Sequence, residues 1–241
     1  MKKEKKRQPV LFSGTILLVL VILVCVLGNK QIKENKESHA EPENDSTSAV
    51  IGGTEEITQV PSFAVAVQSE YYAGQGVVYA GDKGSYYIVT TAHLTEGTEI
   101  GRFCRVTLYD GTETEAVLIY ASEAADVAFL MVQTEKELVP VPQDRTQFDS
   151  LAPGDRITAY SLVEDMLVPT EGQVIHTWVY LEDFALDMML ANLDGQAGMS
   201  GCAILDETGC FVGILCGVSE EGEAAILPYS VIASEMIATG R

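Results

Sequence analysis

The chain has 241 residues, of which 47% are hydrophobic and 21% are charged, and its formal net charge is −20. A nucleic-acid-binding protein needs a basic surface to displace the counterions of the phosphates, so this acidity argues against that class. The apolar content is too high for a disordered acidic tail. Most of the acidity lies in residues 50–241, which hold 7 Lys and Arg against 29 Asp and Glu, a net charge of −22.

The N-terminal segment has the pattern of a membrane anchor. Residues 10–28 contain no charged side chain, and as a helix they would extend about 28 Å, close to the ~30 Å thickness of a hydrocarbon core. Five basic residues lie within residues 1–9, so the positive-inside rule places this basic tail in the cytoplasm. We therefore predict a single-pass signal anchor in the cell membrane, with the rest of the chain outside the cell.

A cleaved signal peptide is the alternative to an anchor. The apolar run is longer than the usual core of a signal peptide, and no Ala-x-Ala-like triplet follows it directly. The nearest candidate triplet, at residues 38–40, lies far from the end of the run. Residues 29–49 are polar and nearly free of large apolar side chains, so we expect them to form a flexible tether.

The remaining residues, 50–241, have the pattern of an all-β domain. Short apolar runs alternate with Gly, Pro and Asp, which is typical of barrels and sandwiches. The strands that we predict are, in chain order, residues 63–67, 76–79, 86–91, 105–109, 115–120, 127–132, 156–160, 173–179, 202–205 and 210–215. Residues 139–150 contain two prolines and no periodicity, so they divide the strands into two barrels, about 50–138 and about 150–241. The only predicted helix covers residues 230–239.

Three short segments carry the side chains of nucleophilic catalysis. His93 follows one apolar strand, Asp126 precedes another, and Ser200 lies between two glycines just before a third. A serine hydroxyl needs a base to remove its proton, and histidine suits that role near neutral pH. The histidine in turn needs an acid that fixes its tautomer. Glycines allow a tight turn whose N–H groups can stabilise an oxyanion.

These segments resemble those of trypsin-fold (chymotrypsin-like) serine proteases, and most closely the HtrA/Deg branch of bacteria. The matching blocks are GQGVV at residues 74–78, IVTTAH at 88–93, ADVAFL at 125–130, GMSG at 198–201 and ILP at 226–228. The resemblance covers almost all of residues 50–241. It implies an all-β fold of two six-stranded antiparallel β-barrels with a C-terminal helix.

The resemblance also implies a role for each residue of the site. His93 would be the general base, Asp126 its orienting acid and Ser200 the nucleophile. The N–H groups of Gly198 and Ser200 would form the oxyanion hole. Asp194 lies six residues before Ser200, where trypsin-like enzymes carry the acid at the floor of the primary substrate pocket. The alternative reading of Asp194 is a surface acid in a chain rich in acids.

Four cysteines lie in the predicted outer domain, namely Cys104, Cys202, Cys210 and Cys216. Outside the cell they could form two disulfides. Three of them fall on one predicted hairpin, where few pairs have the geometry of a disulfide. We therefore favour buried free thiols.

The expected function is that of a membrane-anchored extracytoplasmic serine endopeptidase, which hydrolyses polypeptide substrates through an acyl-enzyme. The alternative is a catalytically silent, protease-like binding or scaffold module, because Met199 and Cys202 depart from the family pattern on either side of the nucleophile. No metal-binding or phosphate-binding motif is present, so we expect no metal and no cofactor. We also expect no nucleic-acid partner and no C-terminal PDZ domain. The sequence leaves oligomerisation open.

Overall fold

The computed structural model describes residues 61–240, except 164–165 and 220. The predicted basic tail (1–9), signal anchor (10–28) and tether (29–49) lie outside the described residues. Within the part of the chain that is described, no helix is both long and apolar enough to span a membrane. The anchor therefore stays a prediction from the sequence.

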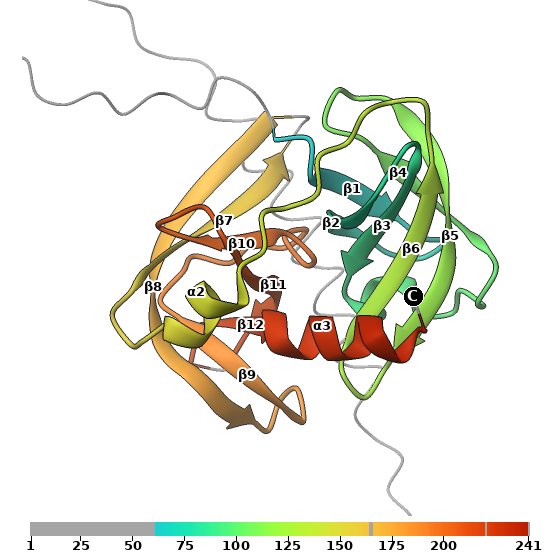
Figure 1. The fold of residues 1–241 in the computed structure, drawn as a ribbon. Coiled ribbons are helices and arrows are strands. Elements are labelled where there is room, and N and C mark those ends of the chain that lie inside the picture. The colour runs from blue at the N-terminus through green and yellow to red at the C-terminus, as the bar shows by residue number, and fades with distance from the viewer. Residues whose placement is uncertain (1–60, 164–165, 220, 241) are drawn as a thin grey trace, which may run out of the picture. The chain divides into compact units, whose positions relative to one another are not determined.

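The first six strands close into one antiparallel barrel, which we call barrel one (Figure 1). Around the barrel the strands follow the order β1-β2-β3-β6-β5-β4. Their bounds are β1 Ala64–Gln68, β2 Ala73–Asp82, β3 Ser85–Thr90, β4 Phe103–Thr107, β5 Glu113–Ser122 and β6 Val127–Gln133.

The next six strands close into a second antiparallel barrel, barrel two, in the order β10-β11-β12-β9-β8-β7. Their bounds are β7 Arg156–Val163, β8 Met166–Leu181, β9 Leu186–Ala191, β10 Ala203–Asp206, β11 Phe211–Val218 and β12 Ala224–Pro228. The prediction of two six-stranded antiparallel barrels is thus confirmed.

Three short helices accompany the barrels. The 3₁₀-helix η1 (Ala92–Thr95) follows β3, and α2 (Arg145–Ser150) lies in the connection between the barrels. The terminal helix α3 (Tyr229–Ala238) follows β12 directly, close to the predicted position. It buries Ile232 and Met236, and its Glu235 accepts a hydrogen bond from the hydroxyl of Tyr120 on β5. The helix therefore ties barrel two, which it follows, to barrel one.

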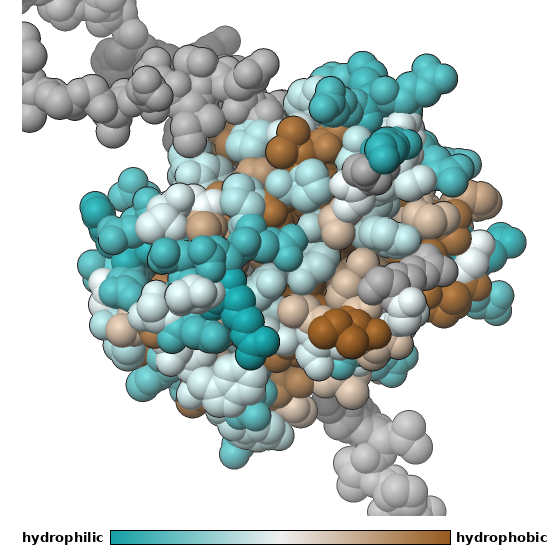
Figure 2. Space-filling model, viewed as in Figure 1, coloured by the Kyte–Doolittle hydropathy of each residue, from teal (hydrophilic) through white to brown (hydrophobic). Residues whose placement is uncertain are grey.

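Apolar side chains of both barrels meet in one large core cluster, and a second, smaller cluster lies within barrel two. Tyr79 of barrel one contacts the ring of Phe129 in the same barrel and the ring of Phe211 in barrel two, in both cases with centroids 6.2 Å apart. Such tilted and edge-on aromatic pairs add to the stabilisation from apolar burial. On the face shown in Figure 2, hydrophilic residues cover most of barrel two and hydrophobic residues are scattered over barrel one.

All ten predicted strand runs overlap an observed strand, and the two strands that the sequence pattern did not reveal are β9 and β12. These two strands pair with each other, with Ile226 opposite Met189. They complete the closure of barrel two between β8 and β11.

Candidate active site

His93 and Asp126 are brought together by the register of two buried strands. Strand β3 pairs with β6 in antiparallel fashion, and its last residue, Thr90, lies opposite Ala128. Beyond this pair the chain continues from β3 into η1, which carries His93, while Asp126 immediately precedes β6. Both side chains therefore emerge at the same end of barrel one.

Asp126 holds both the backbone and the imidazole of His93. Its Oδ1 accepts a hydrogen bond from the His93 N–H at 3.0 Å, and Oδ1 and Oδ2 lie 3.1 and 3.0 Å from Nδ1. A carboxylate in this position favours the tautomer that carries its proton on Nδ1, so Nε2 is left as the basic nitrogen. The His93 side chain is 42% exposed. The ring therefore has the orientation and the open side of a general base.

The backbone of Asp126 adopts a conformation that few residues other than glycine adopt. Its φ is 45°, and aspartate is one of the residue types that enter this region more readily. The N–H of Asp126 donates to the carbonyl of Glu123 at 3.4 Å, which closes the loop between β5 and β6. Strained conformations of this kind persist where the surrounding structure maintains them, and they cluster at functional sites.

Ser200 lies in the segment of residues 196–202 that enters β10, which we call the nucleophile loop. The N–H of Gly201 donates to the carbonyl of Leu215 on β11 at 2.7 Å. This bond brings Ser200 next to Cys216, and Ser200 Oγ donates to the carbonyl of Cys216 at 3.2 Å.

Ser200 Oγ and the imidazole of His93 are not hydrogen-bonded to each other. Among the described residues, the hydrogen bond of Ser200 Oγ is the one to Cys216, while His93 Nε2 lies 3.3 Å from Thr91 Oγ1. Catalytic hydrogen bonds are often absent or long without substrate, and they tighten when substrate binds. In this arrangement Ser200 Oγ and His93 Nε2 each have a different hydrogen-bond partner.

Three N–H groups of the nucleophile loop, those of Ala197, Gly198 and Ser200, have no acceptor in the described part of the chain. The N–H of Met199 donates to the carbonyl of Gln196 at 3.1 Å, and that of Cys202 donates to Met199 at 2.9 Å. The N–H groups of Gly198 and Ser200 are the two donors that the resemblance implied for the oxyanion hole.

A cavity of about 480 Å³ opens beside His93 and is lined by residues of both barrels. Cys216 and Asp126 form part of its wall, whereas Ser200 is not among the described residues that line it. Besides Asp126, its lining includes three carboxylates, those of Glu96, Glu123 and Asp183, and no Lys or Arg among the described residues. Phe184 provides an aromatic surface. The cavity therefore combines an apolar wall with negative charge.

The family model of the trypsin-like peptidase domain matches residues 74–214, which is more than half of the chain. This range contains all three residues of the site and the nucleophile loop. The chain belongs to the trypsin-like peptidase family. The resemblance predicted from the sequence is thus confirmed.

Two relatives of this trypsin-like peptidase illustrate the match. Over 67 residues, or 28% of the chain, it is 34% identical to the serine protease Do-like HtrA of Bacillus subtilis. The chain spans only 14% of that protein. A crystal structure of the serine endoprotease from Yersinia pestis superposes with a TM-score of 0.62 at 20% identity, over 76% of this chain and 64% of that one. At this identity the structural match shows the fold.

Asp194 of this peptidase is exposed, in the segment that leads from β9 to the nucleophile loop. It is absent from the described lining of the cavity beside His93. Its neighbour Gly195 lies close to Val218 at the end of β11, where an added Cβ would be 2.8 Å from the valine side chain. The structure therefore pairs His93 with Asp126, connects Ser200 to this pair through Cys216, and leaves Asp194 near the end of β11.

The four cysteines of the peptidase domain are free thiols, and Cys104, Cys202 and Cys216 are buried. The structure agrees with the favoured prediction rather than with two disulfides. Burial raises the pKa of Cys202 to about 12. Burial, and secondly the nearby Asp126 carboxylate, raise the pKa of Cys216 well above its usual value. Both groups are therefore neutral thiols near neutral pH.

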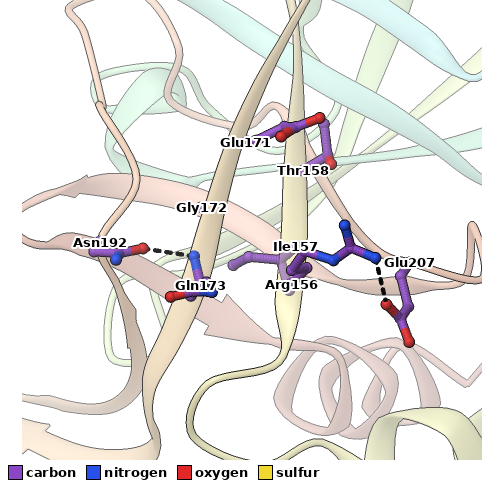
Figure 3. A pocket seen from close by; sticks show the side chains of 8 residues that line it. All are labelled: Arg156, Ile157, Thr158, Glu171, Gly172, Gln173, Asn192 and Glu207. Carbon is purple, nitrogen blue, oxygen red and sulfur yellow. Dashed lines mark hydrogen bonds and ion pairs between the residues drawn. The ribbon is translucent and has the colours of Figure 1, made fainter.

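A second pocket lies on the outer surface of barrel two (Figure 3). It contains an ion pair between Arg156 and Glu207 at 3.2 Å, and the N–H of Gln173 donates to the Asn192 side chain at 2.5 Å. Both charged side chains are more than 60% exposed, so the pair contributes little stability. The pocket shares no lining residue with the cavity beside His93. Among the described residues, no cluster of His, Cys, Asp or Glu is arranged to hold a metal ion.

Two residues of the site had no signal in the sequence. Phe184 lies in the loop between β8 and β9, and its ring lies near Gly217, where an added Cβ would be 3.3 Å from Cζ. Cys216 combines a carbonyl that binds Ser200 with a side chain beside Asp126. Both contacts depend on tertiary pairing of distant segments, which no local motif encodes.

Proposed function

We propose that this protein is a membrane-anchored, extracytoplasmic serine endopeptidase. The observation that carries the catalytic part is the His93–Asp126 pair, held at 3.0 Å in the same cavity as Cys216, whose carbonyl binds Ser200 Oγ. Membership of the trypsin-like peptidase family supports the same reaction.

Acylation begins when substrate displaces the resting hydrogen bonds. Ser200 Oγ exchanges the carbonyl of Cys216 for His93 Nε2, which removes the proton as Oγ attacks the peptide carbonyl carbon. Asp126 stabilises the imidazolium that forms, because both of its oxygens face Nδ1. The N–H groups of Gly198 and Ser200 stabilise the oxyanion.

The tetrahedral intermediate collapses when His93 gives its proton to the leaving amine. The product is an acyl-enzyme on Ser200. Water then attacks the ester, with His93 again acting as the base, and Ser200 is released with its proton. All proton transfers therefore pass through one nitrogen, Nε2 of His93.

Labelling with a fluorophosphonate tests this function, because the reagent reacts with an activated serine. We expect the full chain to be labelled at Ser200, and the Ser200→Ala variant to remain unlabelled. Ser150→Ala is a matched control, since Ser150 is exposed and its hydroxyl bonds only locally, to Gln147. Labelling that persists in folded Ser200→Ala would contradict the proposed nucleophile.

A silent scaffold is the second candidate. It is favoured by the resting bond from Ser200 Oγ to the carbonyl of Cys216, which occupies the hydroxyl proton. In that case the folded wild-type protein would remain unlabelled and would cleave no peptide. The intact Asp126–His93 pair favours the enzyme instead, because a binding module does not require that geometry.

The location of the enzyme rests on the sequence pattern alone. Residues 10–28 are uncharged and follow five basic residues, which supports an anchor with a cytoplasmic N-terminus. We expect the protein in the membrane fraction with its N-terminus intact, and its outer domain accessible to protease added to whole cells. Soluble protein that begins near Glu41 would show cleavage of a signal peptide instead.

A further inference from the structure

Gln75 is a buried polar residue at the contact between the two barrels. It lies on β2 of barrel one and its side chain is largely buried, with the residue only 5% exposed. A buried amide is costly unless its donors and acceptor are satisfied. Each of these partners lies in barrel two. Nε2 donates to the carbonyls of Gly198 at 3.0 Å and Leu162 at 3.3 Å, and Oε1 accepts from the N–H of Leu162 at 2.8 Å.

The side-chain amide of Gln75 forms hydrogen bonds with the backbone of β7. Strand β10 pairs with β7 only as far as Tyr160, which lies opposite Ala203. The backbone of Leu162 lies beyond this ladder, and the Gln75 amide satisfies both its N–H and its carbonyl. Because the N–H of Leu162 requires an acceptor, Oε1 must face it, and Nε2 must therefore face the nucleophile loop.

The backbone of Gln75 binds the same loop. Its N–H donates to the carbonyl of Ser200 at 2.8 Å, and its own carbonyl accepts from Thr90 Oγ1 at 2.6 Å. One residue of barrel one thus binds the carbonyls of both Gly198 and Ser200. These carbonyls belong to the peptide units that directly follow the N–H groups of Gly198 and Ser200.

The closeness of this contact explains the glycine before Gln75. An added Cβ at Gly74 would lie 2.8 Å from the Ser200 carbonyl oxygen and 2.5 Å from the side chain of Leu94. A larger residue would push the nucleophile loop away from β2 and lengthen the bonds from Gln75. The glycine at the start of the GQGVV segment therefore allows β2 to lie close to the nucleophile loop.

Steric contacts do not restrain the loop at Gly198. Its φ is 89°, and no heavy atom lies within 4 Å of the position of an added Cβ. Glycine is free to rotate between several conformations, so a hydrogen bond must define the orientation of the peptide that follows it. That peptide is bound at its carbonyl by Gln75 and at its N–H, that of Met199, by Gln196.

We propose that the Gln75 side chain is a positioning residue that keeps the N–H groups of Gly198 and Ser200 directed at the oxyanion. This inference rests on the proposed peptidase function. Without the Gln75 amide, the peptide between Gly198 and Met199 can rotate. The N–H of Gly198 then loses its fixed direction as well. Loss of one oxyanion donor lowers kcat by about 10² to 10³. The loss should affect the transition state more than the bound substrate.

The test is the Gln75→Met variant, which keeps the length of the side chain and removes its polar atoms. We expect kcat for a peptide substrate to fall at least about tenfold, with KM changed less than about twofold. A peptidyl boronate, whose oxygen occupies the oxyanion position, should bind weaker by the same factor as kcat/KM. Gln143→Met is the matched control, because the Gln143 amide donates to the carbonyl of Tyr79, outside the nucleophile loop. It should leave kcat unchanged.

The Gln75→Asn variant and a hydrogen-exchange measurement provide a second test of the role of Gln75. Gln75→Asn retains the amide but is too short to reach both Leu162 and Gly198, so it should fold and still lose kcat. Hydrogen exchange over residues 196–202 should become faster in both Gln75 variants and not in Gln143→Met. Folded Gln75 variants with wild-type kcat, or with unchanged exchange, would overturn the inference. A wild-type protein without Ser200-dependent turnover would instead contradict the proposed function, and the exchange experiment would still judge the role of Gln75.

Discussion

Asp126 acts on His93 through two different groups, the backbone N–H and the imidazole Nδ1. The first bond fixes where η1 begins relative to β6, and the second fixes the tautomer of the ring. A side chain that bound only the backbone N–H would leave the imidazole free to turn about χ2. The position of the candidate general base therefore depends on one carboxylate just before the start of β6.

The Asp126→Asn variant separates geometry from charge. Asparagine can accept from the backbone N–H of His93, so we expect the fold and its melting temperature to change little. Its amide presents an N–H₂ group toward Nδ1, which favours the wrong tautomer and removes the charge that stabilises the imidazolium. Loss of a triad carboxylate in this way lowers kcat by about 10⁴. Steady-state kinetics on a peptide substrate measure the effect.

An Asp126→Asn variant with near wild-type kcat would show that another acid orients the ring. Glu123→Gln is the control at this position, because Glu123 lines the same cavity but is not among the hydrogen-bond partners of His93. It should change kcat less than about threefold.

The nucleophile loop is an element whose shape depends on one close backbone contact. Gly201 has a φ of 87°, and an added Cβ would lie 1.9 Å from the Gln75 carbonyl oxygen and 2.8 Å from Thr90 Oγ1. Both neighbours are held in place within barrel one, so they cannot move aside cheaply. The loop and β2 can approach each other only if this residue is glycine.

Gly201→Ala should therefore abolish labelling of Ser200 by a fluorophosphonate. Gly209→Ala is its matched control, since Gly209 has a similar φ of 81° but no heavy atom within 4 Å of its Cβ position. The control should show only the backbone strain of a left-handed residue, about 1 to 2 kcal/mol in the free energy of unfolding. Urea denaturation and labelling of both variants measure the difference. Equal labelling of the two would show that the loop tolerates displacement.

The elements that could be predicted from the sequence are those whose pattern is local. The strands before His93 and after Asp126 are apolar and contain β-branched residues, so the sequence predicts both the strands and their ends. Strand β9 is rich in Leu and Met, and β12 begins with two alanines and ends at Pro228. These residue types have weak or unfavourable strand preferences. Pairing with each other and with neighbouring strands determines both segments, and this pairing is a tertiary property.

In the candidate site, too, some features follow from local sequence patterns and others depend on tertiary contacts. The nearest neighbours of the three candidate catalytic residues follow from short motifs, because each lies close to one end of a strand. The bonds from Ser200 to Cys216 and from Gln75 to Gly198 join residues 16 and 123 positions apart. Such contacts depend on the closure of barrel two and its packing on barrel one. No periodicity within a single segment contains that information.

At the scale of the whole molecule, residues 50–241 are strongly acidic, and part of this charge lies in the cavity beside His93. Residues 50–241 carry a net charge of −22, and the described cavity beside His93 has four carboxylates and no cation. Charges of one sign in a cleft raise the local concentration of oppositely charged ligands. We therefore expect this field to favour polypeptide substrates with basic segments and to disfavour acidic ones.

This field predicts how the rate depends on substrate charge and on salt. For peptides that differ only in flanking residues, kcat/KM should be highest with Lys or Arg, intermediate with Gln and lowest with Glu. At low ionic strength we expect about a tenfold range, which should shrink at 0.5 M NaCl because the Debye length falls well below its ~10 Å at 0.1 M.

The Asp194→Asn variant tests whether Asp194 contributes a local contact in addition to the long-range field. If Asp194 forms the floor of the primary pocket, the variant will lose the preference for Lys or Arg only at the residue before the cut. Rates that are indifferent to charge at low salt would contradict both contributions.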